Sequence, residues 1–302
     1  MIEQRRAPFL RLRIEDGADG AVELIDVGIR NAGHRRIVHF RVVPELPEVE
    51  LYCRYFSAHA LHQRVAAVRV LDERILAVRT AALKKALVGR EFTQVRRHGK
   101  HLFADAGSSW LHLHFGMSGD LFYYSEDGVQ PRFARVVFEF ENGARLAYDD
   151  MRLFGVVDVT PDPDSFIADH RLGPDPLGPD FRLPVFRRIV EGRRGAVKSL
   201  LMTQEIIAGM GNLYADETLY RASIHPRRAV DALSDAEVKA IFTGIRGVLE
   251  EAIAFKSRGG DYPGRWLTQH REEGDRCPRC GGTIQRTVVF GRTTYFCAKH
   301  QV

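Results

Sequence analysis

The proline-rich stretch between residues 161 and 184 is the feature that most constrains how this chain can fold. Six of the 13 prolines fall within it, and each proline fixes φ and removes a backbone donor. Before the stretch, short segments alternate apolar and polar residues, as strands do; after it, apolar residues recur at helical spacing. The expected strands are 65–71, 94–97, 101–104, 110–115, 135–140, 145–148 and 156–159, and the expected helices are 48–61, 186–191, 197–207, 213–222 and 235–255. We therefore predict an α+β multidomain protein in which an antiparallel β-sandwich with flanking helices precedes a helical bundle.

The last 30 residues predict a separate small module that holds a metal. Its four candidate ligands are Cys277, Cys280, Cys297 and His300. Two pairs of ligands on two turns can close a tetrahedron around zinc, and strand-like runs on both sides of Gly291 indicate a β-hairpin zinc finger. The alternative, two incidental pairs, leaves a tail too short to fold without such a support. One structural Zn²⁺ is therefore expected, in a reducing compartment rather than an oxidising one.

Composition excludes several classes of protein. With 302 residues, 45% of them apolar, the chain is long enough for two globular domains. Its 44 Lys and Arg exceed 39 Asp and Glu only slightly, so only a local cluster of basic residues could indicate a nucleic-acid partner. No apolar run approaches the roughly 18 residues of a membrane span. We expect no membrane association, and a monomer is the default.

The segment from Lys198 to Pro226 predicts a helix, a tight turn and a second helix. Gly209 and Gly211 permit close backbone approach or positive φ. The second helix is expected to begin near Asn212, and the free N–H groups at such a helix start suit a DNA phosphate. Taken alone, a glycine-rich turn between helices is more often purely structural.

A proline followed by two glutamates occurs in an unexpected place, at residues 44–50. At a mature amino terminus Pro44 would be a secondary amine, able to attack a sugar carbon and form an iminium. Here 43 residues precede it, with eight Arg, no Lys and six acidic residues. They contain no secretory signal, and their acidic residues do not suit a transit peptide.

Four segments together resemble the formamidopyrimidine-DNA glycosylase and endonuclease VIII family of base-excision repair enzymes. They are residues 44–50, 113–119, 209–215 and 291–294, and the resemblance covers about 85% of the chain. The first two segments favour the formamidopyrimidine branch. The resemblance implies a bacterial, cytoplasmic glycosylase and AP lyase that acts on damaged double-stranded DNA.

The resemblance also implies roles for individual residues. Pro44 would attack C1′ of the damaged nucleotide, Glu45 would be the general acid and base, and Glu48 would order water or the amine. Strand cleavage by β- and δ-elimination would follow. Further residues would hold the flanking phosphates or lie near the lesion: Lys100, Arg292, Asn212 and Lys198. Because the lesion must leave the base stack, other side chains would fill the gap: Met117, Arg152 and Phe154.

The chain departs from the family pattern in three ways. His300 replaces a fourth cysteine, and the extension precedes Pro44. The region between residue 255 and Cys277 is also short, although family members close a mobile loop over 8-oxoguanine there. We therefore expect ring-opened purines or oxidised pyrimidines to be better substrates than 8-oxoguanine.

The expected domains are 1–43 (an extension), 44–160 (β-sandwich), 161–184 (linker), 185–270 (helix–two-turn–helix) and 271–302 (zinc finger). We expect the working chain to begin at Val43, because a bacterial valine codon can be read as an initiating methionine, whose removal exposes Pro44. If residues 1–43 stay attached, Pro44 is an ordinary amide, and the alternative is a non-catalytic protein that binds DNA lesions.

Overall fold

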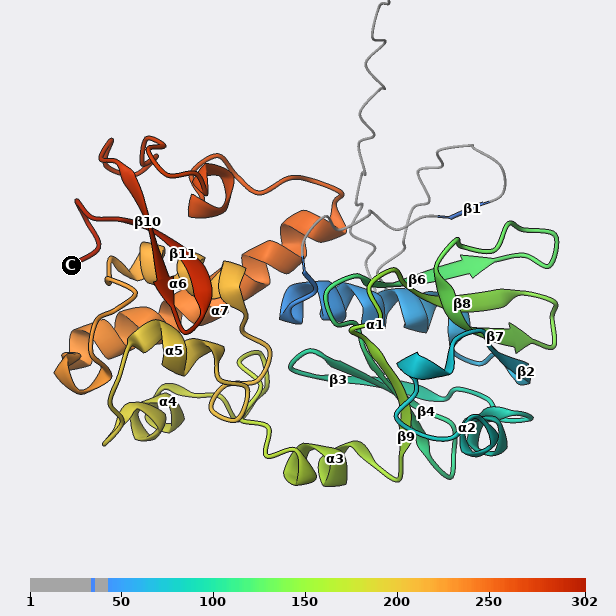
Figure 1. Ribbon diagram of the computed structural model, residues 1–302. Coiled ribbons are helices and arrows are strands. Elements are labelled where there is room, and N and C mark those ends of the chain that lie inside the picture. Colours follow the sequence, from blue (N-terminus) through green and yellow to red (C-terminus); the bar gives the residue numbers. More distant parts are fainter. Residues whose placement is uncertain (1–33, 36–42) are drawn as a thin grey trace, which may run out of the picture.

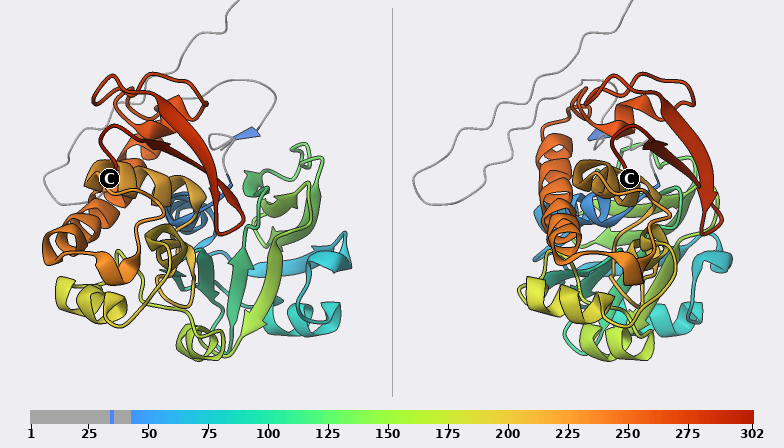
Figure 2. Two further views of the ribbon diagram at one scale, coloured as in Figure 1. Left: turned by 60° about the vertical axis from the view of Figure 1, so that its left-hand side comes forward. Right: turned by 90° about the vertical axis from the view of Figure 1, so that its left-hand side faces the viewer.

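The computed structural model describes residues 34–35 and 43–302. Most of the expected extension, 1–43, lies outside the described residues. The chain forms a β-rich half and a helical half with the helix α1 (Leu46–Ala60) between them (Figure 1). The zinc-finger hairpin lies on the helical half, and two rotated views show it extending along that half (Figure 2).

The β-rich half is a sandwich of two antiparallel sheets, which confirms the predicted fold. One sheet has the order β1 (His34–Arg35), β6 (Gly119–Tyr124), β8 (Arg145–Asp150), β7 (Ala134–Phe140) and β2 (Val65–Val70). The other has the order β3 (Gln94–His98), β4 (His101–Asp105), β5 (Trp110–His114) and β9 (Val156–Thr160). The seven strands expected between residues 65 and 159 are all present within one or two residues of their predicted ends.

Strand β6 and helix α2 (Thr80–Leu87) were not expected from the sequence. Strand β6 is buried at five of its six positions, so it lacks the apolar–polar alternation by which a half-exposed strand is recognised. Helix α2 has only eight residues and buries only Leu83 and Leu87. That is too little of a helical period to stand out.

Helix α1 belongs to both halves of the molecule. Val49 and Phe56 are fully buried in the core of the sandwich, whereas Leu46 and Leu51 are buried in the core of the helical half. The helix begins where predicted because Pro47 suits a first turn. As a result, the segment that precedes α1 is positioned by two cores.

The proline-rich stretch contains the helix α3 (Pro163–Asp169) and crosses from one half to the other. The Asp162 side chain caps α3 by accepting the N–H groups of Asp164 and Ser165. Further along, Asp175 accepts the Gly99 N–H at 2.7 Å and pairs with Arg97, so the crossing is tied to the β3–β4 turn.

The helical half contains α4 (Leu183–Val190), α5 (Val197–Met202), α6 (Asn212–Ala222) and α7 (Asp235–Ser257). The expectation of a helix over 197–207 was wrong, because α5 ends at Met202. The Gln204 side chain donates to the carbonyls of Met202 and Met210 and accepts the Gly209 N–H. These bonds hold the segment between α5 and α6 as an ordered loop rather than a tight turn.

The C-terminal hairpin consists of β10 (Ile284–Val289) and β11 (Arg292–Cys297), as predicted. Its two-residue turn places Phe290 and Gly291 at φ +52° and +66°, the signs that a type I′ turn requires. Short 3₁₀ turns occur at Glu73–Ile75, Val230–Ala232 and Leu267–His270. No helix in the described part of the chain is both long and apolar enough to cross a bilayer.

Candidate active site and metal centre

Two glycines let distant segments meet at the start of α1. The Leu46 N–H donates to the Gly209 carbonyl at 3.1 Å. Gly209 adopts φ +97°, and a Cβ there would lie 2.7 Å from Leu46 Cδ1. A Cβ on Gly99 would lie 2.8 Å from that of Ala208. The buried Pro44 therefore lies where the sandwich, the β3–β4 turn and the loop before α6 converge.

Glu45 is a buried carboxyl held against the first turn of α6. Its Oε1 accepts the Leu213 N–H at 3.0 Å, and its Oε2 lies 3.5 Å from the Tyr214 nitrogen. Burial raises the pKa of Glu45 above its usual value, and this effect outweighs the opposite influence of Lys100. A Cβ on Gly211 would lie 2.2 Å from Glu45 Cδ, so a larger residue at this position would displace the Glu45 carboxyl.

The start of α6 is occupied by a carboxylate of the protein itself. The N–H groups at the beginning of α6 were expected to receive a DNA phosphate, yet two of them face the Glu45 carboxylate. Helix amino termini favour negative charge, and here the protein supplies that charge itself. The side chain of Asn212 is also engaged, because it donates to the Thr293 carbonyl at 3.0 Å.

Glu48 is fully buried and has partners from three helices. Its Oε2 accepts the Glu45 N–H at 2.9 Å, and its Oε1 accepts the Tyr214 hydroxyl at 2.7 Å. The ammonium of Lys256, in the last turn of α7, lies 3.1 Å from Oε1. The carboxylate is thereby fixed in one orientation at the start of α1.

Lys100 and Arg292 add positive charge beside the two carboxylates. Lys100 lies at the turn between β3 and β4. Burial lowers its pKa, and so does the charge of Arg292, while Glu45 and Glu48 act in the opposite direction. Arg292 is exposed at the first position of β11. Both residues therefore belong to the same electrostatic neighbourhood as Pro44.

Lys198 occupies a different position from the one expected of a residue that contacts DNA. Its side chain is fully buried, 2.6 Å from Asp216 Oδ1. It donates to Asn212 Oδ1 at 2.7 Å and to Thr294 Oγ1 at 2.6 Å. Its three protons are thus directed at groups of α6 and β11, which join the helical half to the hairpin.

Met117, Arg152 and Phe154 lie on two adjacent loops, as their proposed common role requires. All three side chains are exposed, and the Arg152 guanidinium lies 5.0 Å from the centre of the Phe154 ring. A Cβ on Gly116 would lie 2.3 Å from the Phe154 carbonyl carbon, so the two loops are in direct contact.

The buried Asp150 holds these two loops together. It accepts the N–H groups of Arg152 at 3.1 Å and Gly155 at 2.8 Å and also bonds the Ser118 hydroxyl. Three exposed side chains are thereby presented on a rigid base.

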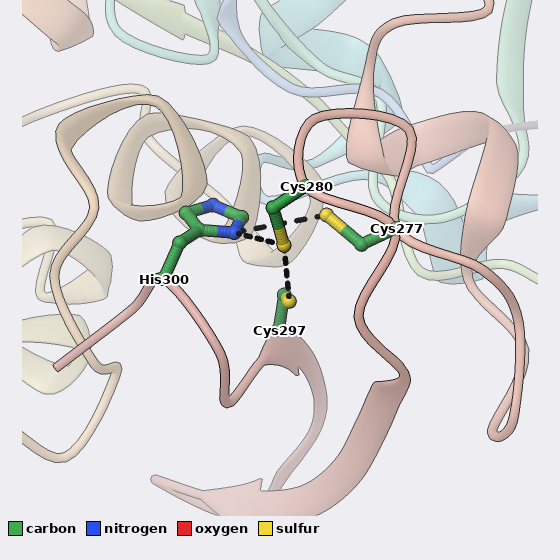
Figure 3. Close-up of side chains that lie close together, drawn as sticks. All are labelled: Cys277, Cys280, Cys297 and His300. Carbon is green, nitrogen blue, oxygen red and sulfur yellow. Dashed lines mark hydrogen bonds between the residues drawn. The ribbon is translucent and has the colours of Figure 1, made fainter.

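The four predicted metal ligands converge at the base of the hairpin (Figure 3). The Sγ atoms of Cys280 and Cys297 are 3.4 Å apart, and His300 Nδ1 lies 3.4 Å from Cys280 Sγ and 3.7 Å from Cys277 Sγ. A zinc tetrahedron with Zn–S bonds of about 2.3 Å has ligand separations of roughly 3.5–3.8 Å. The three sulfurs and one nitrogen therefore fit a structural zinc ion.

The surroundings of His300 support its role as a ligand. Its Nε2 lies 3.4 Å from the Tyr220 carbonyl, the kind of outer contact that fixes the tautomer of a ligating histidine. Burial lowers the pKa of His300, which favours the neutral imidazole that metal binding requires. Replacing the family's fourth cysteine by histidine thus preserves the centre.

Several residues of the site were not expected from the sequence. The sequence indicated a role for Asp150 only weakly, because it is the second of two acidic residues at the end of a strand. Tyr214 and Lys256 were not indicated as partners of Glu48, because both contacts join positions far apart in the sequence. Tyr262 gave no signal either, and its hydroxyl contacts that of Tyr214.

A β-sandwich, a pair of helices joined by an ordered glycine-containing loop and a hairpin zinc finger define a class of zinc-finger proteins with two main domains. Three sequence models match in the same order. They are the formamidopyrimidine-DNA glycosylase N-terminal domain at residues 43–157, the H2TH domain of the same family at 172–261, and a zinc finger found in FPG and IleRS at 274–299. The chain belongs to the formamidopyrimidine-DNA glycosylase family.

Relatives and solved structures agree with this assignment. The formamidopyrimidine-DNA glycosylase of Paracoccus denitrificans is 35% identical over 285 residues, covering 84% of this chain and 98% of that protein. That of Streptococcus pneumoniae is 31% identical, covering 86% and 99%. The Lactococcus lactis enzyme, solved non-covalently bound to DNA with an AP site, has a TM-score of 0.78 and 28% identity over 85% of this chain and 99% of that one.

Proposed function

We propose that this protein is a DNA glycosylase with AP-lyase activity that removes oxidised or ring-opened bases from double-stranded DNA. The observation that carries the proposal is the buried Pro44–Glu45 pair, held by α6 beside Lys100 and Arg292. The family membership supports it, since the solved structures of the Lactococcus lactis relative include complexes with DNA that contains an abasic site or an N7-benzyl-Fapy-dG lesion.

The reaction begins with the secondary amine of Pro44. Its nitrogen attacks C1′, the bond from C1′ to the base breaks, and the resulting iminium permits β- and then δ-elimination of the two flanking phosphates. A terminal amine titrates near 7.7–8.0. The positive end of α1, which starts two residues later, favours the neutral form that attacks.

Glu45 is the proton donor and acceptor of the site. Its raised pKa lets a buried carboxyl carry a proton closer to neutral pH than an exposed one can. The proton can pass to the departing base or to the opening sugar ring. The two N–H groups at the start of α6 then stabilise the carboxylate that remains.

DNA binding is shared between both halves of the molecule. Lys100 and Arg292 bind the phosphates around the lesion, and Asn212 and Lys198 hold the hairpin that carries Arg292. Met117, Arg152 and Phe154 fill the gap left by the flipped nucleotide. We propose that the protein acts as a monomer in the cytoplasm. Zinc stabilises the finger and takes no part in the chemistry.

The active form begins at Pro44. The N-terminal family model matches from residue 43, and 86% of this chain suffices to cover 99% of the Streptococcus pneumoniae relative. An amide at Pro44 would have no nucleophilic lone pair. Intact mass spectrometry of the protein from its native host tests this point. A full-length chain of 34.2 kDa would favour the alternative, a protein that binds lesions without cleaving them.

The substrate class follows from the short segment after α7. Only nine residues separate the end of α7 at Ser257 from the buried Leu267, too few for the long mobile loop that closes over 8-oxoguanine in family members. Ring-opened purines and oxidised pyrimidines are therefore the preferred lesions. Single-turnover kinetics on duplexes with one defined lesion test the preference, and fastest release of 8-oxoguanine would contradict it.

Borohydride trapping tests the enzymatic proposal as a whole. The chain starting at Pro44 should form a covalent adduct with a lesion duplex when the iminium is reduced. Pro44→Gly should lose most of the adduct, whereas Pro47→Ala, in the same segment, serves as a folded control. An adduct that persists after Pro44 is removed would assign the nucleophile to a lysine instead.

A further inference from the structure

Lys256 is a buried cation beside the proposed active site that none of the roles above uses. Its side chain is 8% exposed and its ammonium lies 3.1 Å from Glu48 Oε1. The ammonium also lies 4.9 Å from the centre of the Tyr262 ring. A lysine in the last turn of a helix is favoured by the helix dipole, but burial of its charge requires a partner of opposite sign. Glu48 is that partner.

Glu48 in turn determines the geometry of the segment that carries the nucleophile. Its Oε2 accepts the N–H of Glu45, the residue directly after Pro44, at 2.9 Å. Its other oxygen receives both the Tyr214 hydroxyl and Lys256. Removal of one member of a buried pair leaves an uncompensated charge. Loss of Lys256 would therefore disturb the acceptor that orients the Pro44–Glu45 peptide.

The short segment after α7 is tied to the same network. The hydroxyls of Tyr262 and Tyr214 are 2.7 Å apart. The Tyr262 ring stacks on the fully buried Trp266, with 4.9 Å between ring centres and 22° between planes. The segment is thus joined through Tyr262 to the residues that hold Glu48.

We propose that Lys256, supported by Tyr262, is a positioning residue that keeps the Glu48 carboxylate oriented toward the Pro44–Glu45 peptide. This inference rests on the proposed function of Pro44. It adds that the end of α7 governs the alignment and the protonation of the nucleophile. The charged and titratable groups around the amine come from every surrounding element: Glu45, Glu48, Lys100, Arg292, Tyr214, Tyr262 and Lys256.

The sign of the pH effect follows from these charges. In the native site the positive charge of Lys256 offsets the negative charge of Glu48. Without Lys256 the net charge near the amine is more negative, which favours its protonated, non-nucleophilic form. The acidic limb of the pH–rate profile should therefore move to higher pH.

The experiment measures borohydride trapping and lesion release from pH 5.5 to 9 for the chain that starts at Pro44. We expect Lys256→Met to move the acidic limb upward by about half a pH unit or more and to slow trapping at pH 7 by about 10- to 100-fold. Lys256→Arg should restore most of the rate and the original profile. Tyr262→Phe should give a smaller loss, because it removes only the hydroxyl contact.

Lys239→Met is the matched control, because Lys239 is an exposed lysine on the same helix. Thermal unfolding of each variant identifies loss of the fold, and the Arg and Phe variants keep the test valid if the Met variant is unstable. An unchanged pH profile in Lys256→Met, with trapping by the native sequence intact, would overturn this inference alone. Absence of trapping by the native sequence would instead overturn the proposed function.

Discussion

Because Lys198 is buried, its substitution can distinguish a structural role of this residue from a role in binding DNA phosphate. Lys198→Met keeps the length of the side chain but removes the charge that faces Asp216 at 2.6 Å and the donors to Asn212 and Thr294. Asp216 keeps Arg271, 2.7 Å from its other oxygen. Breaking a buried pair by removing one partner costs about 3–5 kcal/mol, and the remaining arginine places this case near the lower limit.

A loss of about 3 kcal/mol lowers the melting temperature by roughly 6–12 °C for a protein of this size. Circular dichroism measures that shift. The second assay is the dependence of binding to an abasic-site duplex on salt concentration. A lysine that neutralises a phosphate contributes about 0.9 to the slope of log K against log salt. A lysine that contacts only other protein residues makes no contribution to this slope.

We therefore expect the melting temperature of Lys198→Met to be about 6–12 °C lower. Below that temperature, the slope of log K against log salt for DNA binding should be unchanged. Arg292→Ala is the control with the opposite signature, because this exposed side chain should lower the slope by about 0.9 and leave the melting temperature nearly constant. A Lys198→Met protein that melts within about 2 °C of the native sequence and loses about one unit of slope would refute the structural role.

Further predictions concern the close approach at Glu45, the histidines and the metal. Gly211→Ala should reduce trapping at least about 100-fold, since the new Cβ would lie 2.2 Å from Glu45 Cδ; Gly247→Ala, with no atom within 4 Å of its Cβ, should instead stabilise α7 by up to about 1 kcal/mol in urea titrations. Burial lowers the pKa of His112 to about 3 and that of His114 to about 4, and it lowers the pKa of His101 well below its usual value. The unfolded chain therefore binds more protons than the folded one, and the free energy of unfolding should rise with pH from about 4 to 6.5, by up to about 4 kcal/mol per pH unit. A urea midpoint that stays constant over this range would contradict the lowered pKa values of these three histidines. Cys297→Ala should abolish zinc content in elemental analysis and lower DNA affinity while the sandwich still folds; retention of one zinc per chain would remove Cys297 from the ligand set.

The parts of the site that were predictable are those whose signal is local in the sequence. The metal ligands occur as two close pairs on turns, so their spacing alone indicates the chemistry, and the zinc finger is confirmed. The loop residues Met117, Arg152 and Phe154 have no such local signal and were found only through the family resemblance.

Contacts between distant segments were not predictable in this way. Lys256 continues the helical period of α7, and nothing in that pattern indicates its partner Glu48 on α1. Tyr262 lies in a proline-containing loop, and no pattern there indicates its contact with Tyr214 on α6. Lys198 is a second example, in which the sequence pattern predicts exposure but the side chain is buried. A lysine early in an amphipathic helix is ordinarily solvated, and only the presence of Asp216 on α6 explains why this one is buried.

The membership of α1 in both hydrophobic cores has a mechanical consequence. A protein that encloses DNA between two halves can open by rotating one half relative to the other. Here the axis of such a rotation would pass close to α1, which follows the proposed nucleophile Pro44, since Leu46 and Leu51 are fixed to one half while Val49 and Phe56 are fixed to the other. A change in the angle between the two halves would therefore also change the direction in which the Pro44 nitrogen points. A hinge motion that admits DNA would also misalign the nucleophile until closure restores it.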